Sequence, residues 1–166
     1  MKRLWAPWRM KYVEYVTIEK KRTCFLCEAA RSQVSKESLV IFKDENWFVM
    51  LNLYPYNTGH LLVAPYRHVA TLDDLTEEEL RDLGQVLQKA VKLVKLTYNP
   101  DGFNIGLNLG RVAGAGLEDH LHFHIVPRWN GDTNFMPILA NTKVIPEAIY
   151  DTYERLAKKL KELNLT

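Results

Sequence analysis

Apolar and polar side chains alternate strictly along residues 120–126, which read His-Leu-His-Phe-His-Ile-Val. A period of two is typical of a β-strand, because successive side chains of a strand point to opposite faces. The pattern therefore predicts a strand with the imidazoles of His120, His122 and His124 on one face. The other face is apolar and can enter a core, so the imidazoles are expected to line a surface or cleft.

The rest of the chain alternates short β-rich runs with two helical patterns. Strands are predicted over 39–43, 47–53, 60–65 and 103–108, with turn signals at 44–46 and 55–59. A short helical turn is predicted over 28–34. Thr76 and Glu79 form a capping box that begins a helix ending before Asn99. An apolar stripe from Ile145 to Leu163 predicts a final helix, with Pro146 in its first turn.

These elements predict an α+β fold: one antiparallel meander sheet with two main helices outside it. A chain of 166 residues fits one domain, 1–166, with an N-terminal arm (1–37). Residues 1–23 are expected to form an irregular stretch that packs its aromatic side chains on the body. A glycine-rich loop over 110–116 lies directly before the histidine strand.

Composition restricts the function classes only modestly. An apolar content of 47% with 25% charged residues is that of an ordinary globular protein. The net charge of +2 is too small to indicate binding to nucleic acid or a membrane. No secretory signal or membrane-spanning run is recognised, and two cysteines spaced Cys-x-x-Cys do not resemble a secreted disulfide framework. The expected compartment is the cytoplasm.

The histidine pattern indicates a reaction site. Successive imidazoles on one face of a strand lie about 6.5–7 Å apart, so the outer pair cannot share one metal ion without distorting the strand. Burying three titratable rings together is costly, which favours a reaction site over mere packing. Imidazole is a good nucleophile near neutral pH. If the nucleophile is His122, a backbone carbonyl must hold the proton on its other nitrogen. A slight turn of the strand could offer the carbonyl of His120.

Continued as Pro-Arg-Trp over 127–129, this strand resembles the signature of the histidine triad superfamily of nucleotide hydrolases and transferases. Asn52, the Thr-Gly-His turn over 58–60, and Asn108 with the loop before the strand resemble other motifs of that superfamily. The opening LWAPWR, the Cys-x-x-Cys pair and the segment NLGRVAGAG are similar to a prokaryotic branch that includes diadenosine tetraphosphate phosphorylases.

The resemblance implies a role for each matching residue. His122 would be the nucleophile on an α-phosphorus, His124 would donate a hydrogen bond to the phosphate, and His60 would support His124. Asn52 would contact the ribose, and Asn108 the phosphate oxygens. The backbone amides around Ala115 and Gly116 would cradle phosphate. Trp129 would lie near the base, although it could equally cap the core.

The implied function is cleavage of dinucleoside polyphosphates, such as diadenosine tetraphosphate, through a covalent nucleotidyl-histidine. The acceptor would be phosphate, in a phosphorylase, or water, in a hydrolase. Phosphorylase relatives carry a hydroxyl residue where this chain has Gly116, so both acceptors stay open. Nucleoside phosphoramidate hydrolysis is an alternative, as is a non-catalytic nucleotide-binding module.

Two further expectations concern partners. Cys24 and Cys27 offer two thiolates to one tetrahedral ion, which needs two more ligands. Zinc-bearing relatives imply His68 and His120 as those ligands, in a structural zinc site; the alternative is a reduced, unliganded thiol pair. No organic cofactor is expected. The stripe of the helix from Thr76 and the open sheet edge, together with the resemblance, predict a homodimer.

Overall fold

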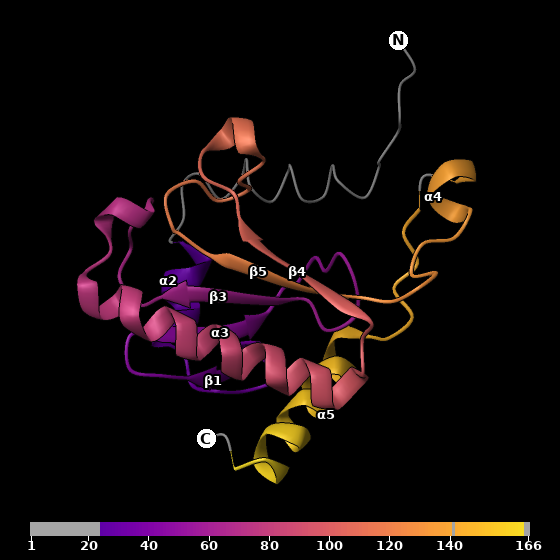
Figure 1. Ribbon diagram of the computed structural model, residues 1–166, viewed down its shortest axis with the longest axis horizontal. Helices are drawn as coiled ribbons and strands as arrows, with labels where there is room; N and C mark the ends of the chain where they lie inside the picture. Colours follow the sequence, from indigo (N-terminus) through magenta and orange to yellow (C-terminus); the bar gives the residue numbers. More distant parts are fainter. Residues whose placement is uncertain (1–23, 141, 165–166) are drawn as a thin grey trace.

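The computed structural model describes residues 24–140 and 142–164, so the predicted irregular stretch over 1–23 lies outside the described residues. One five-stranded sheet forms the centre of the molecule (Figure 1). Its spatial order is β1-β2-β3-β5-β4, and every neighbouring pair is antiparallel. The predicted α+β fold with a single antiparallel sheet is therefore confirmed. The sheet departs from a simple meander in one respect, because β5 lies between β3 and β4. The strands are β1 Val40–Lys43, β2 Trp47–Leu51, β3 Leu61–Pro65, β4 Gly102–Leu107 and β5 Phe123–Arg128.

Helices cover one face of this sheet. The long helix α3, Glu77–Tyr98, packs on β2, β3 and β5, and α5, Ile149–Glu162, lies against α3 and β1 (Figure 1). Phe123 and Ile125 of β5 are buried in the core beneath the helices. Because side chains alternate along a strand, His124 points to the opposite face. The helices thus stabilise the sheet and leave the histidine face accessible.

The boundaries of α3 follow from its caps. The hydroxyl of Thr76 accepts from the amide of Glu79 at 3.1 Å, and the Glu79 carboxylate accepts from the amide of Thr76 at 2.7 Å. The helix ends at Asn99, which adopts a left-handed conformation with φ of 47°. Asparagine tolerates this conformation better than most residues do, so the predicted end of the helix is confirmed.

The predicted boundaries of the other strands differ by one or two residues, but three elements begin three or four residues away from their predicted starts. The histidine strand begins at Phe123, so His120, Leu121 and His122 precede it. The amide of Leu121 donates to the carbonyl of Val69, outside the sheet ladder, which ends the regular strand there. The last helix begins at Ile149, so Pro146 precedes it instead of occupying its first turn. The first described helix, α2, spans Phe25–Arg31 and begins earlier than the predicted 28.

Short elements complete the described chain: the 3-10 turns η1, Leu72–Asp74, and η2, Arg111–Ala113, and the helix α4, Met136–Leu139. In Figure 1, α4 projects from the body beyond the end of the sheet. Within the described ranges, none of the helices has the length and apolar character needed to span a membrane.

Candidate active site and metal centre

Two histidines from neighbouring strands form a hydrogen-bonded pair. His60 directly precedes β3 and is fully buried, and His124 lies on β5 opposite Leu62. The Nε2 atom of His60 is 2.9 Å from Nδ1 of His124. The backbone amide of Tyr56 donates to Nδ1 of His60 at 3.0 Å, so the proton of neutral His60 lies on Nε2. His60 therefore donates to His124, and the proton of His124 lies on its Nε2.

His122 is held in the other tautomer, with its proton on Nδ1. Its Nδ1 donates to the carbonyl oxygen of His120 at 2.8 Å, which leaves the lone pair of Nε2 free. The carbonyl of His120 is thus placed as the sequence predicted. The ring centroids of His122 and His124 are 5.0 Å apart. A nitrogen nucleophile and a nitrogen-bound proton therefore lie side by side.

Burial keeps these imidazoles neutral. It lowers the pKa of His60 to about 3 and that of His124 to about 4, with a further contribution from the neighbouring histidines. Burial also lowers the pKa of His122, against the hydrogen bond to His120. An unprotonated imidazole is the nucleophilic form, so the site is prepared to react at neutral pH.

We call His60, His122 and His124 the histidine cluster. The glycine-rich loop follows β4, which pairs with the strand that carries His124. Asn108 follows β4, and its side-chain amide donates to the carbonyl of Gly114 at 3.4 Å. Gly114 has φ of +93°, a conformation that residues with a Cβ rarely adopt. The amide of Ala115 donates to the carbonyl of Gly110, so it is used inside the loop. This leaves Gly116 as the better donor of the two to an incoming phosphate.

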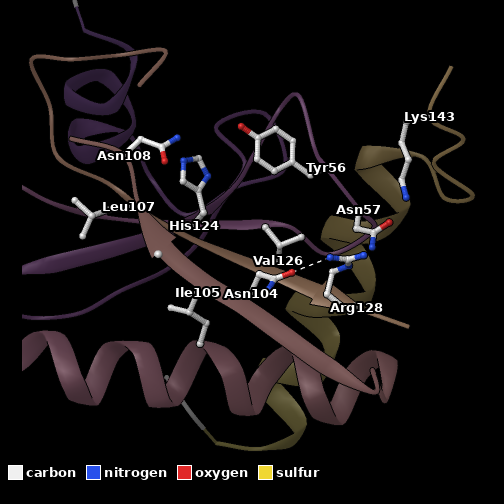
Figure 2. A pocket seen from close by; sticks show the side chains of 11 residues that line it. Tyr56, Asn57, Asn104, Ile105, Leu107, Asn108, His124, Val126, Arg128 and Lys143 are labelled. Atoms are coloured by element: carbon white, nitrogen blue, oxygen red, sulfur yellow. Dashed lines mark hydrogen bonds between the residues drawn. The ribbon is translucent and has the colours of Figure 1, made fainter. Parts of the chain in front are cut away.

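An open cleft of about 480 Å³ runs from the histidine cluster along β5 and β4. Figure 2 shows Asn108 and His124 toward one end and Arg128 and Lys143 toward the other, with Tyr56 beside His124. Asn52 lies outside its lining, 3.4 Å from Nδ1 of His60 by its side-chain amide. Trp129 is half-buried and also lies outside the lining.

Several cleft residues were missed by sequence reasoning. The period of two that placed His124 continues through Val126 to Arg128, and this signal could have found both. Tyr56 and Lys143 stand in irregular segments, where no periodic pattern indicates which way a side chain points.

A second cluster consists of two cysteines and two histidines. The ligand-type atoms of Cys24, Cys27, His68 and His120 all lie within 4.8 Å of one another. Nδ1 of His120 is 3.3 Å from Sγ of Cys24, and Nδ1 of His68 is 3.2 Å from Sγ of Cys27. The two thiols are not joined in a disulfide. The sequence thus predicted correctly which four residues meet.

This cluster fits a tetrahedral metal ion. Nε2 of His120 donates to the carbonyl of Pro65 at 2.9 Å, which fixes its proton there and turns the Nδ1 lone pair toward the cysteines. In a tetrahedral zinc site two sulfur and two nitrogen ligands lie roughly 3.3–3.8 Å from one another. The sulfur–nitrogen separations of 3.2, 3.3 and 3.5 Å in this cluster are close to that range. Burial raises the pKa of the Cys24 thiol to about 11, so binding of a metal would release its proton.

Comparison with known proteins agrees with this geometry. The profile of the HIT domain matches residues 33–131. This range includes His60, the glycine-rich loop and the three histidines at 120, 122 and 124. The chain belongs to the histidine triad (HIT) family. A HIT domain accounts for the sheet, α3 and the histidine cluster, whereas α5 lies beyond the matched residues.

Several curated relatives of this HIT protein carry enzyme names, among them the following two. An AP-4-A phosphorylase of Mycobacterium tuberculosis (strain H37Rv) is 44% identical over 162 residues, covering 95% of this chain and 83% of the relative. A bis(5'-adenosyl)-triphosphatase of Dictyostelium discoideum is 34% identical, covering 77% and 85%. Among solved structures, a Zn-bound histidine triad family protein from Mycobacterium smegmatis superposes with a TM-score of 0.67 at 26% identity. That alignment covers 86% of this chain and 96% of the other.

Proposed function

We propose that this HIT protein cleaves dinucleoside polyphosphates, such as diadenosine tetraphosphate, at the α-phosphate through a covalent nucleotidyl-His122 intermediate. The observation that carries the proposal is the hydrogen bond from Nδ1 of His122 to the carbonyl of His120, which leaves Nε2 free to attack. The similarity to an AP-4-A phosphorylase at 44% identity supports the substrate class.

The chemical step follows from the two fixed tautomers. Nε2 of His122 forms a bond to the α-phosphorus, and the bond from that phosphorus to the bridging oxygen breaks. The departing oxygen takes the bonding electron pair, and the Nε2–H of His124 donates a hydrogen bond to it. His60 keeps that proton on Nε2 by donating to Nδ1 of His124. Phosphoryl centres need mainly positioning and charge stabilisation, which these groups supply.

The remaining residues would hold the attacked nucleotide in the roles that the family resemblance implies. Asn108 and the amide of Gly116 would bind its phosphate oxygens, Asn52 its ribose, and Trp129 its base. In the second step an oxygen of inorganic phosphate or of water forms a bond to the same phosphorus. The bond from that phosphorus to Nε2 of His122 breaks, and the bonding electron pair returns to Nε2. We favour phosphate slightly, because a glycine-rich loop can bind an anion through backbone amides without a hydroxyl side chain.

Product analysis distinguishes the reactions. With diadenosine tetraphosphate, phosphorolysis gives ADP and ATP only when phosphate is present, whereas hydrolysis gives AMP and ATP regardless of phosphate. Mass spectrometry of the protein after rapid quenching should show one nucleotidyl group on His122. Binding without cleavage or labelling would refute the enzyme proposal and indicate a nucleotide-binding module. Cleavage of an adenosine phosphoramidate with no cleavage of the tetraphosphate would indicate the phosphoramidate reaction.

We propose that Cys24, Cys27, His68 and His120 hold a structural zinc ion. The donor set, the separations within 4.8 Å and the similarity to a Zn-bound HIT protein support this. Zinc would tie α2 to the segment after β3 and to the first histidine of the triad. Elemental analysis of protein purified without added metal tests the proposal, which fails below about a tenth of an equivalent of zinc.

We propose a homodimer as the working assembly. In α3, the core-facing side chains are Val86, Ala90, Leu93 and Val94. A second apolar row on the same helix is only partly covered, and β4 is a sheet edge whose Ile105 is 48% exposed. Both surfaces could be covered by a second copy. The partly covered row on α3 consists of Leu80, Leu83, Leu87 and Val91. A monomer mass by light scattering at micromolar concentration would refute the homodimer.

A further inference from the structure

The cleft extends well past the reacting histidines. Along β5 its lining passes from His124 through Val126 to Arg128, and β4 contributes Asn104 opposite Val126. Four strand residues correspond to about 13 Å, which suits a phosphate chain better than a single phosphate. His122 is not part of this lining. The cleft therefore begins beside the nucleophile and leads away from it.

The two cations at the far end of the cleft differ in their partners. Arg128 donates to both carboxylate oxygens of Asp132, at 2.5 and 3.0 Å, and its remaining terminal nitrogen donates to the side-chain oxygen of Asn104. Its charge is thus neutralised by Asp132. Lys143 donates to the backbone carbonyl of Asp132, and no carboxylate in the described residues lies within ion-pair distance of it. Lys143 therefore brings an unneutralised positive charge to the cleft.

The near end of the cleft has an aromatic wall. The ring of Tyr56 lies 5.8 Å from that of His124 at an interplanar angle of 22°, and 57% of Tyr56 is exposed. In Figure 2 its ring stands beside His124, on the side toward Lys143. A molecule leaving the His122 site across His124 would pass this ring before it reaches Lys143.

We infer that this cleft is the binding site for the leaving nucleotide, with Lys143 as the residue that recognises its phosphate chain. The inference rests on the proposed function. In an in-line displacement the leaving oxygen departs on the side away from the nucleophile. His124 is the next histidine along the face, its Nε2–H meets that oxygen, and the cleft continues beyond it. The chain that follows the oxygen is a polyanion, which the free charge of Lys143 attracts.

Two ligands distinguish the cleft from the site at His122: the whole substrate would occupy both, whereas its attacked half would occupy only the site at His122. The background is His122→Ala, which cannot turn the substrate over, and the ligands are diadenosine tetraphosphate and AMP at fixed ionic strength, measured by titration calorimetry. We expect Lys143→Met to weaken binding of the tetraphosphate about tenfold or more and that of AMP less than twofold. Lys143→Arg should restore most of the affinity. Lys158→Met, an exposed charge removal on α5, should change neither.

Each other result overturns the inference. Equal losses for both ligands would place the attacked nucleotide in the cleft, and no loss for either would mean that the cleft is not used. If Lys143→Met and Lys158→Met lose the same affinity for the tetraphosphate, the loss reflects net charge alone and not a contact made by Lys143. The proposed function is tested separately, by labelling of His122 in the unsubstituted protein. If labelling occurs while Lys143→Met binds normally, only the cleft assignment fails.

Discussion

Three backbone groups set the protonation pattern of the histidines, one residue at a time. The carbonyl of His120 accepts from His122, the amide of Tyr56 donates to His60, and the carbonyl of Pro65 accepts from His120. A backbone amide can only donate and a backbone carbonyl can only accept, so each contact selects one tautomer. The chemistry of each ring is therefore decided by the fold around it.

Replacement of His122 tests most directly whether its Nε2 is the nucleophile. We expect His122→Ala to lower nucleotidyl transfer by about a thousandfold or more, because no other nitrogen in the cluster has a free lone pair facing the same space. The melting temperature should change little, since the ring contributes to the histidine face and not to the core under the helices. Activity and thermal unfolding of the same preparation give the answer. Retention of substantial activity would show that another group attacks.

The depressed pKa values of His60 and His124 predict how stability varies with pH. Above about pH 6.5 both imidazoles are neutral whether the chain is folded or unfolded. Below it the unfolded chain binds protons, whereas the folded chain does not until about pH 4 for His124 and about pH 3 for His60. The unfolded state then holds more protons, so the free energy of unfolding should fall as pH drops from 6.5 toward 4.

Urea unfolding at several pH values between 7 and 4.5 measures this dependence. His60→Asn removes one of the two titrating rings, so its free energy of unfolding should decline less steeply than that of the unsubstituted protein, whatever its absolute stability. Identical slopes for the two proteins would contradict the assignment of the proton uptake to this pair.

At the scale of elements, predictability depended on whether a local pattern or a distant contact decides the structure. The capping box and Asn99 define α3 locally, and both ends were predicted. The histidine alternation continues through 120–122, yet β5 begins at Phe123. There the ring of His120 lies next to the cysteines at the start of α2, and the amide of Leu121 donates to the carbonyl of Val69. No short sequence pattern contains these contacts. The same reason hid Lys143, whose place in the cleft depends on tertiary structure alone.

The cap of α3 gives an element-scale prediction. Thr76→Ala removes the acceptor for the Glu79 amide, and we expect a loss of about 1 kcal/mol in the free energy of unfolding. Thr76→Ser keeps a hydroxyl at the same place and should lose little. Urea unfolding of both variants at neutral pH measures the difference. If Ala and Ser behave alike, the cap hydrogen bond contributes nothing and α3 is held by its packing on the sheet alone.

At the scale of the whole molecule, the cysteine–histidine cluster connects the catalytic strand to a part of the chain far away in sequence. Cys24 lies 96 positions before His120, and α2 otherwise joins the body through a few buried side chains such as Leu26. His120 belongs to both centres: its ring faces the cysteines and its carbonyl holds the proton of His122. A metal ion there would fix the ring whose backbone orients the nucleophile.

Removal of zinc should therefore affect stability first and catalysis second. A site loaded at about a thousand times its Kd stabilises the folded state by about 4 kcal/mol, which for a chain of this length corresponds to roughly 10 °C in melting temperature. We expect a chelator to lower the melting temperature by about this amount and zinc to restore it. Cys24→Ser should already have the lower value and not respond to the chelator, whereas Thr76→Ser, which keeps all four cluster residues, should respond like the unsubstituted protein. Because the carbonyl of His120 depends on its anchored ring, labelling of His122 should also slow in the chelated protein at temperatures where it remains folded. An unchanged melting temperature after verified metal removal would show that α2 and the triad are held together without the ion.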